Sequence, residues 1–129
     1  MESTTTDRLK HVLESIQKDL NGILGFVIFT NDGFPIISTL PVNPRSHISE
    51  QELFSAIGAG LIALSERTLR QIKMSGLNKI TIESSDGNVA VEKIDDETGI
   101  MAISTTDTPL GMLRLAVEKA RKSAKEILS

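Results

Sequence analysis

The sequence predicts an α/β fold of the α+β type, in which one five-stranded, mostly antiparallel sheet is flanked by helices in the order α-β-β-α-β-β-β-α. Three segments repeat apolar residues at helical spacing, and five shorter segments are continuously apolar or alternate apolar with polar residues. Asn31-Asp32-Gly33, Asp86-Gly87 and the acidic turn Asp95–Gly99 are short connections between strands. Because parallel neighbours need a long crossover, these turns indicate antiparallel hairpins.

Composition limits the classes of function. The 129 residues, of which 40% are hydrophobic and 24% charged, are typical of one globular domain, placed at 1–129 with 1–6 as a flexible lead. The absence of cysteine excludes disulfides, thiol nucleophiles and iron–sulfur clusters. A net charge of −3 and 3% aromatic residues do not favour nucleic-acid binding. No apolar run reaches the ~20 residues that span a bilayer, so we expect a cytoplasmic protein without membrane insertion.

The N-terminal third is predicted as a helix followed by a hairpin. Apolar residues over 6–20 fall on one helical face, and Gly22 ends that helix. Ile23–Thr30 is continuously apolar and rich in β-branched residues, which predicts a strand buried on both faces. The returning strand spans 34–39, and Pro35 places it at a sheet edge because proline cannot donate to a ladder.

A long middle helix follows the proline-containing loop Leu40–His47. Ser49 and Glu52 form a capping box at its start. We expect the helix to continue to about Met74 and Gly76 to end it.

The C-terminal part is predicted as strands over 77–84, 88–94 and 100–105 and a final helix. Thr108 is expected to cap this helix, with Pro109 at its first position. The apolar face of the helix comprises Leu110, Leu113, Val117, Ala120, Ala124 and Ile127.

The middle helix is apolar over nearly twice the arc that one contact surface needs. One stripe consists of Leu53, Ile57, Gly60 and Leu64, and a second consists of Phe54, Gly58, Leu61, Ile62, Leu69 and Ile72. One stripe covers the sheet, and the other meets either a second copy of the chain or another of its own helices. Small residues along the helix favour a close, two-fold symmetric helix pair. We expect the side formed by Phe54, Gly58, Leu61, Ile62, Ser65 and Leu69 to face the partner.

Catalytic patterns in the sequence lack their supporting residues. Ser15–Lys18 fits S-x-x-K but lies on an amphipathic helix, and His47 with Glu50 gives only two ligands for a metal. No glycine pattern matches a phosphate-binding loop. We therefore predict no catalytic, cofactor-binding or metal-binding residues, and a protein that is not an enzyme.

Two charged clusters have alternative interpretations. Asp95-Asp96-Glu97 is a solvated turn or a weak cation site. Lys119, Arg121, Lys122 and Lys125 either complement the dipole of the last helix or form a basic patch for an acidic partner or an anionic membrane.

Several segments carry a resemblance to a known family. They are the hairpin Gly25–Ile36 with its Asp-Gly turn and Pro-Ile pair, the stretch Ala63–Arg67, the stretch Ile82–Gly87, and Pro109-Leu110-Gly111. In this order and spacing they resemble the Roadblock family, the dynein light chain type of small regulatory domain. The resemblance implies a Roadblock/profilin-like fold over nearly the whole chain.

The resemblance also implies dimers, formed with itself or with a paralogous Roadblock-like chain. The middle helices would pair, and the sheets would join through the strand at 77–84. This adds Leu77, Lys79, Thr81 and Glu83 to the predicted interface. Family members bind Ras-like small GTPases or attach cargo to dynein, and they share no universal catalytic residue or cofactor.

Two functions from different classes follow. The first is a dimeric regulator or scaffold that modulates the nucleotide cycle of a Ras-like GTPase, in which Arg45, Arg67 or Arg70 could act as an arginine finger. The second is a structural light-chain adaptor that tethers subunits or cargo without nucleotide dependence. A small-ligand sensor is a third class, but the sequence shows no convergent polar pocket.

Overall fold

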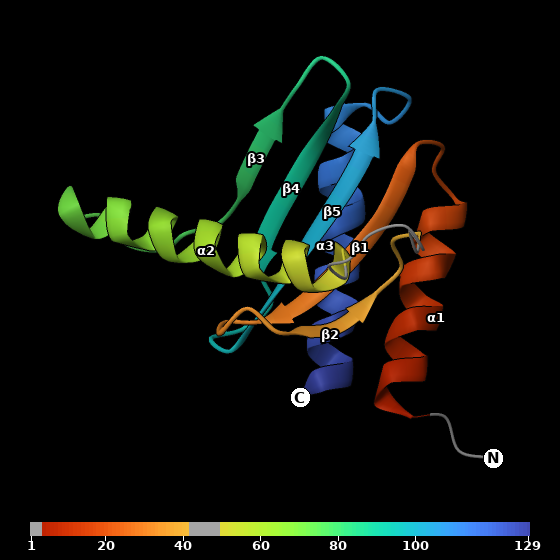
Figure 1. The fold of residues 1–129 in the computed structure, drawn as a ribbon, viewed down its shortest axis with the longest axis horizontal. Coiled ribbons are helices and arrows are strands. Elements are labelled where there is room, and N and C mark those ends of the chain that lie inside the picture. The colour runs from red at the N-terminus through yellow and green to blue at the C-terminus, as the bar shows by residue number, and fades with distance from the viewer. Residues whose placement is uncertain (1–3, 42–49) are drawn as a thin grey trace.

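The computed structural model describes residues 4–41 and 50–129, and its elements follow the predicted order (Figure 1). The strands form one antiparallel sheet in the order β2-β1-β5-β4-β3, with β2 at an edge as Pro35 indicates. The predicted fold class is therefore confirmed. The elements are α1 (Thr5–Lys18), β1 (Ile23–Thr30), β2 (Pro35–Ser38), α2 (Glu50–Gln71), β3 (Ile80–Glu83), β4 (Gly87–Lys93), β5 (Thr98–Thr105) and α3 (Leu110–Leu128).

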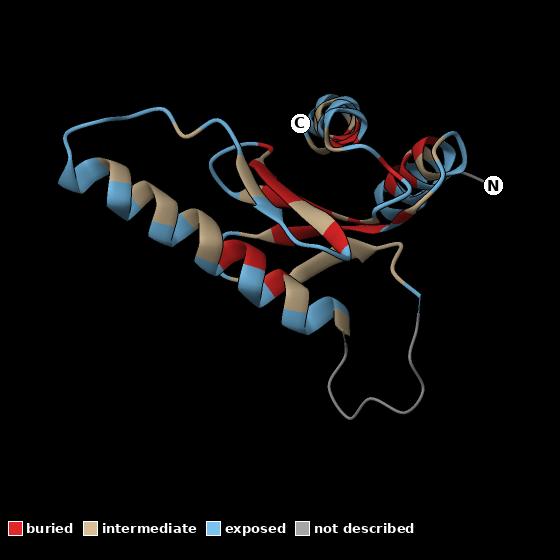
Figure 2. Ribbon diagram, turned by 90° about the horizontal axis from the view of Figure 1, so that it is seen from above, coloured by how far each residue is buried: buried red, intermediate tan, exposed pale blue. Residues whose placement is uncertain are grey.

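The sheet separates two helical layers (Figure 2). Helices α1 and α3 cover one face, where Phe26 and Ile28 of β1 join their core cluster. Helix α2 crosses the other face, where Val27 and Phe29 belong to a second cluster. Strand β1 is thus buried on both faces, as its continuously apolar sequence predicts.

Helix α1 begins earlier than predicted. Thr4 and Asp7 form a reciprocal capping box, in which the Asp7 N–H donates to the Thr4 hydroxyl at 3.0 Å. Residues 5 and 6, predicted as part of a flexible lead, are the first residues of the helix. The prediction missed this cap because the run of threonines offers several equivalent positions for it.

Helix α2 ends earlier than predicted. It stops at Gln71, and Lys73 takes the left-handed conformation with φ of 58°. The Lys73 N–H donates to Arg70 O at 3.1 Å and the Met74 N–H to Leu69 O at 2.8 Å, which is a Schellman ending. The prediction that Gly76 ends the helix is therefore wrong. The predicted cap residue Ser49 and residues 42–47 of the loop before the helix lie outside the described residues.

Thr108 does not cap α3. Pro109 is the N-cap residue, and no side chain caps the helix there. The Thr108 side chain is buried, and its hydroxyl donates to the carbonyl of Asn21 instead. This bond joins the turn after α1 to the start of α3, so Thr108 stabilises the packing of two elements rather than one helix end.

Candidate interaction surface

The side of α2 that was predicted to meet a partner packs against the chain's own sheet. Phe54, Leu61 and Ile62 pack on the cluster around Phe29. Gly58 is buried, and a Cβ on it would lie 2.6 Å from the Phe29 ring. The predicted orientation is therefore wrong at these four positions, because the Phe29 ring occupies the space where a side chain at position 58 would lie.

The opposite stripe of α2 is exposed. Leu53, Ile57 and Leu64 leave 46%, 41% and 62% of their surface accessible. A Cβ on Gly60 would meet nothing within 4 Å. A row of large apolar side chains in water is typical of interaction surfaces. We call these four residues the outer α2 face.

The C-terminal half of α2 extends beyond the edge of the sheet (Figure 1). The buried residues of the helix, Ser55, Gly58 and Ala59, all lie in its first half. In the second half, Ser65 and Leu69 from the predicted interface are only half-buried. This projecting half therefore carries apolar surface that its own sheet does not cover.

Strand β3, at the edge beside the projecting helix, is shorter than predicted. It pairs with β4 only from Ile80 opposite Val91 to Glu83 opposite Asn88. The predicted start at Leu77 is wrong, because Gly76 has a φ of +82° and the chain joins the sheet only at residue 80. Leu77 and Lys79 of the predicted interface therefore precede the strand, whereas Thr81 and Glu83 lie within it.

The backbone of β3 presents free hydrogen-bonding groups to its outer side. The Ser84 N–H donates to the Gly87 carbonyl at 2.9 Å, so the backbone of residue 84 faces β4. In an antiparallel ladder the direction alternates along the strand. Residues 80 and 82 therefore also face β4, and the N–H and C=O groups of Thr81 and Glu83 face the open edge.

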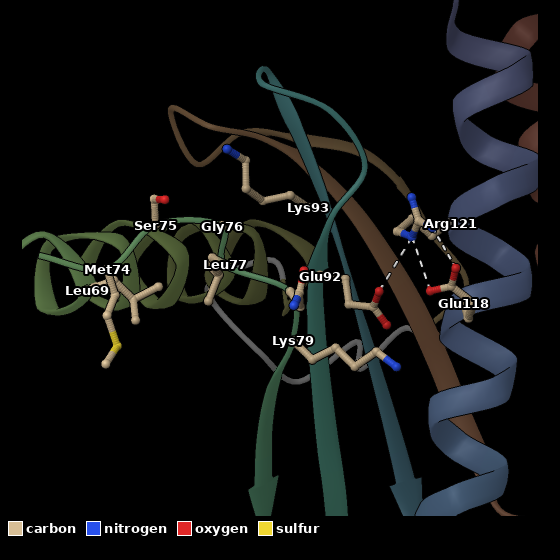
Figure 3. Close-up of a pocket in the computed structure, with 11 residues that line it drawn as sticks. Leu69, Met74, Ser75, Gly76, Leu77, Lys79, Glu92, Lys93, Glu118 and Arg121 are labelled. Carbon is tan, nitrogen blue, oxygen red and sulfur yellow. Dashed lines mark hydrogen bonds and ion pairs between the residues drawn. The ribbon is translucent and has the colours of Figure 1, made fainter.

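A cleft of about 1090 Å³ lies where α2, the chain before β3, β4 and α3 come together (Figure 3). Leu69, Met74 and Leu77 provide apolar side chains on one side of it. Glu92 and Arg121 provide charged groups on the other side (Figure 3). The cleft therefore joins the apolar projecting helix to a group of partly buried charges.

Glu92 is the least exposed charge of this group, with 5% of its surface accessible. Arg121 Nε lies 3.4 Å from its carboxylate, while Arg121 Nη2 donates to Glu118 at 2.6 Å. Burial, together with repulsion from Glu118, raises the pKa of Glu92 to about 7. The hydrogen bond from Arg121 lowers the pKa of Glu118 to about 2. The two carboxylates share one guanidinium, and Glu92 is the one that takes up a proton near neutral pH.

The acidic turn between β4 and β5 has a structural role. One carboxylate oxygen of Asp95 accepts hydrogen bonds from the backbone N–H groups of Glu97 and Thr98, both at 2.8 Å. Lys93 lies 3.1 Å from Glu66 and 3.8 Å from Asp96, and it links the turn to α2. Within residues 4–41 and 50–129, no group of three or more His, Asp or Glu side chains could hold a metal.

Sequence reasoning missed Glu92 and misassigned Arg121. A usable signal was present, because Ala90 and Glu92 of β4 and Ile94 just after it lie two residues apart, which places them on the same side of an extended chain, and both apolar residues are buried. Arg121 was assigned to the helix dipole or a basic patch, yet it pairs with Glu92 and Glu118. Of the candidate arginine fingers, Arg67 and Arg70 are exposed on the projecting helix, and Arg45 lies outside the described residues.

The fold places this chain in a class of small domains in which one helix and a helix pair enclose a five-stranded antiparallel sheet. The model of the Roadblock/LC7 domain matches residues 10–105, and the chain belongs to this family. The uncharacterized protein MJ0714 of Methanocaldococcus jannaschii is 27% identical over 121 residues, which cover 91% of this chain and 97% of that protein.

Two solved structures share the fold. MglB of Myxococcus xanthus superposes with a TM-score of 0.83 at 17% identity, covering 99% of this chain and 92% of its own. A Roadblock/LC7 domain from Streptomyces avermitilis gives a TM-score of 0.80 at 13% identity, covering 92% and 95%. At these identities the superpositions establish the shared architecture.

Proposed function

We propose that this chain is a non-catalytic, dimeric regulator or scaffold that binds a Ras-like small GTPase in the cytoplasm and modulates its nucleotide cycle. One observation carries the proposal: the apolar outer face and projecting half of α2 lie beside an open β3 edge. Membership of the Roadblock/LC7 family supports the GTPase as the class of partner. No helix in residues 4–41 and 50–129 is long and apolar enough to cross a membrane.

A second copy, or a paralogous chain, would cover both features at once. The projecting half of α2 would lie over the partner's sheet, and the outer α2 face would meet its counterpart. The open β3 edge would pair with the partner's β3 and would no longer invite uncontrolled strand addition. This arrangement keeps three predicted interface residues at the sheet edge, Lys79, Thr81 and Glu83. On α2, the outer α2 face takes the place of the predicted interface residues that pack against the chain's own sheet.

The sequence of the β3 edge selects one register for a two-fold pair. The segment from Lys79 to Glu83 has opposite charges at equal distances on the two sides of Thr81. Two copies that pair antiparallel about Thr81 are therefore complementary in charge. In that register each Thr81 meets its counterpart through outward-facing backbone groups, and Lys79 of one copy lies opposite Glu83 of the other. A register centred on Glu83 would place like charges together, which is unfavourable.

A charge-reversal experiment tests the dimer and its register together. Lys79→Glu alone and Glu83→Lys alone should each weaken self-association, because every such homodimer contains two like-charge pairs. An equimolar mixture of the two variants should restore association, because both pairs then have opposite charges. Sedimentation velocity measures the self-association of each sample. Lys119→Glu, at an exposed position of α3, is the control for altered net charge.

Each outcome of this experiment has a defined meaning. Restored association in the mixture supports the pairing about Thr81. Variants that dimerise as well as the natural chain would exclude the register centred on Thr81. A natural chain that stays monomeric at high concentration would remove the homodimer and leave pairing with a paralogous chain to be tested.

Affinity capture from a lysate of the source organism tests the GTPase. Parallel samples contain excess GDP or a non-hydrolysable GTP analogue, and the Lys79→Glu variant serves as the bait impaired in dimerisation. Enrichment of a Ras-like GTPase only with the analogue, and only by the dimer, would support the proposal. Equal capture of other proteins with both nucleotides would favour the structural light-chain adaptor.

A further inference from the structure

The β3 edge lies beside a buried acidic group that the proposed function does not use. Glu92 belongs to β4, the strand next to β3, and its carboxylate lies under α3 at the wall of the cleft (Figure 3). On α3, the Arg121 Nε lies 3.4 Å from this carboxylate. Arg121 is already held by Glu118, to which it donates two hydrogen bonds of 2.6 and 3.3 Å.

This arrangement leaves one negative charge without a full counter-ion whenever Glu92 is ionised. Glu92, Glu118 and Arg121 then sum to −1, and with Glu92 protonated they sum to zero. Lys122, 3.8 Å from Glu118, is mostly exposed to water. On β5, the residue opposite Glu92 is the apolar Ile100.

Lys79 is a further cation that acts on Glu92, and it is part of the proposed interface. It lies on the segment that leads into β3, and its side chain points toward the Glu92 carboxylate (Figure 3). Its charge favours the ionised form of Glu92. Lys93 lines the same cleft, but Glu66 and Asp96 hold its ammonium group.

In the proposed dimer, two acidic groups would compete for Lys79. Inside one chain it is attracted to ionised Glu92, and between chains it would lie opposite Glu83 of the second copy. An ammonium group drawn toward the cleft is less available at the sheet edge. Removing the charge of Glu92 therefore frees Lys79 for the contact between copies.

We propose that Glu92 is a proton-binding site that controls self-association, so that its protonation strengthens pairing of the β3 edges by releasing Lys79. This inference rests on the proposed function, because it concerns the same edge. Its direction follows from the charges alone: uptake of a proton on each chain removes an internal competitor and lowers the net negative charge that the two copies bring together. The consequence is a dimer that tightens as the pH falls through neutrality.

The test measures the dimer Kd by sedimentation at about pH 6 and about pH 8 for the natural chain and for Glu92→Gln. Each exposed ion pair contributes little, so we expect the natural dimer to be about threefold to tenfold tighter at the lower pH. Glu92→Gln should associate tightly at both pH values. Glu126→Gln, at an exposed position of α3, is the matched control and should behave as the natural chain.

The outcomes separate this inference from the proposed function. Equal Kd at both pH values in the natural chain would overturn the inference and leave the dimer intact. A pH dependence that persists in Glu92→Gln would also overturn it, because a group other than Glu92 would then be responsible. A chain that never associates would overturn both proposals.

A titration by NMR gives a second, independent readout of the coupling. The carboxyl carbon of Glu92 and the Cε carbon of Lys79 are followed across neutral pH in dilute protein. We expect both signals to change with one midpoint, and the Lys79 change to vanish in Glu92→Gln. A Lys79 signal that does not follow Glu92 would overturn the inference even if the dimer responds to pH.

Discussion

The two faces of the sheet are covered in different ways. On one face, α1 and α3 close a continuous core in which Leu113 and Val117 are fully buried. On the other face, α2 buries only small residues, Ser55, Gly58 and Ala59, and leaves Leu64 exposed. The first face is therefore closed by large, fully buried side chains of its helices, whereas the helix on the second face leaves large apolar side chains exposed.

The largest effect should come from a buried leucine on the closed face. Leu113→Ala should lower the free energy of unfolding by about 2–5 kcal/mol, because it leaves a cavity under α3. Leu64→Ala on the open face should cost less than about 0.5 kcal/mol in dilute protein. Urea unfolding measures both, with Leu115→Ala, 65% exposed on α3, as the control. Equal losses at Leu113 and Leu64 would contradict the division of roles.

Glu92, at the margin of the closed face, should make stability depend on pH. The pKa of Glu92 is raised from 4.5 to about 7, so the folded chain holds a proton that the unfolded chain releases across that window. Its contribution to the free energy of unfolding therefore falls as pH rises from about 4.5 to 7, and Glu92→Gln should remove about 1–3 kcal/mol of that fall. Urea unfolding of dilute protein across this window measures the effect. Parallel pH profiles for the natural chain and Glu92→Gln would contradict the burial of an ionisable Glu92.

Two glycines of α2 sharpen the comparison within a single helix. Gly58 faces Phe29, and an added methyl group would clash with the ring, so Gly58→Ala should cost about 1–3 kcal/mol. Gly60 faces open space, so Gly60→Ala should raise the stability of the monomer by up to about 1 kcal/mol. Thermal unfolding in dilute solution measures both. If the outer α2 face meets a second copy closely, Gly60→Ala should also weaken that dimer.

The fold was predictable from local patterns, because hairpin turns and apolar periodicity act over a few residues. Asn31-Asp32-Gly33 lies in the connection between β1 and β2, and Asp86-Gly87 lies where the connection between β3 and β4 meets β4. Register and orientation required knowledge of contacts between distant segments. The side of α2 that meets the sheet is set by the Phe29 ring, which packs over Gly58. The sequence alone does not show this, because both stripes of the helix have enough apolar residues to pack on the sheet or to meet a partner.

The candidate site was predictable only in part. The β3 edge appeared through the alternation of Thr81 and Glu83 with isoleucines. The pairing of Glu92 with Arg121 joins residues 29 positions apart across the packing of α3 on the sheet, and no local pattern encodes it. Thr108 was misassigned for a similar reason, since its partner Asn21 lies 87 residues away.

The smallest effect concerns the end of the projecting helix, where no sheet supports the chain. Lys73 adopts a φ of 58°, a conformation that costs a residue with a Cβ roughly 1 kcal/mol relative to glycine. Lys73→Gly should therefore raise the free energy of unfolding by up to about 1 kcal/mol and slow amide exchange in the last turn of α2. Lys73→Ala is the control, because it removes the charge but keeps the Cβ. If the alanine variant gains as much as the glycine variant, charge rather than backbone strain limits this end. A gain in stability that occurs only in the glycine variant would show that local backbone geometry, and not packing, determines where the projecting half of α2 ends.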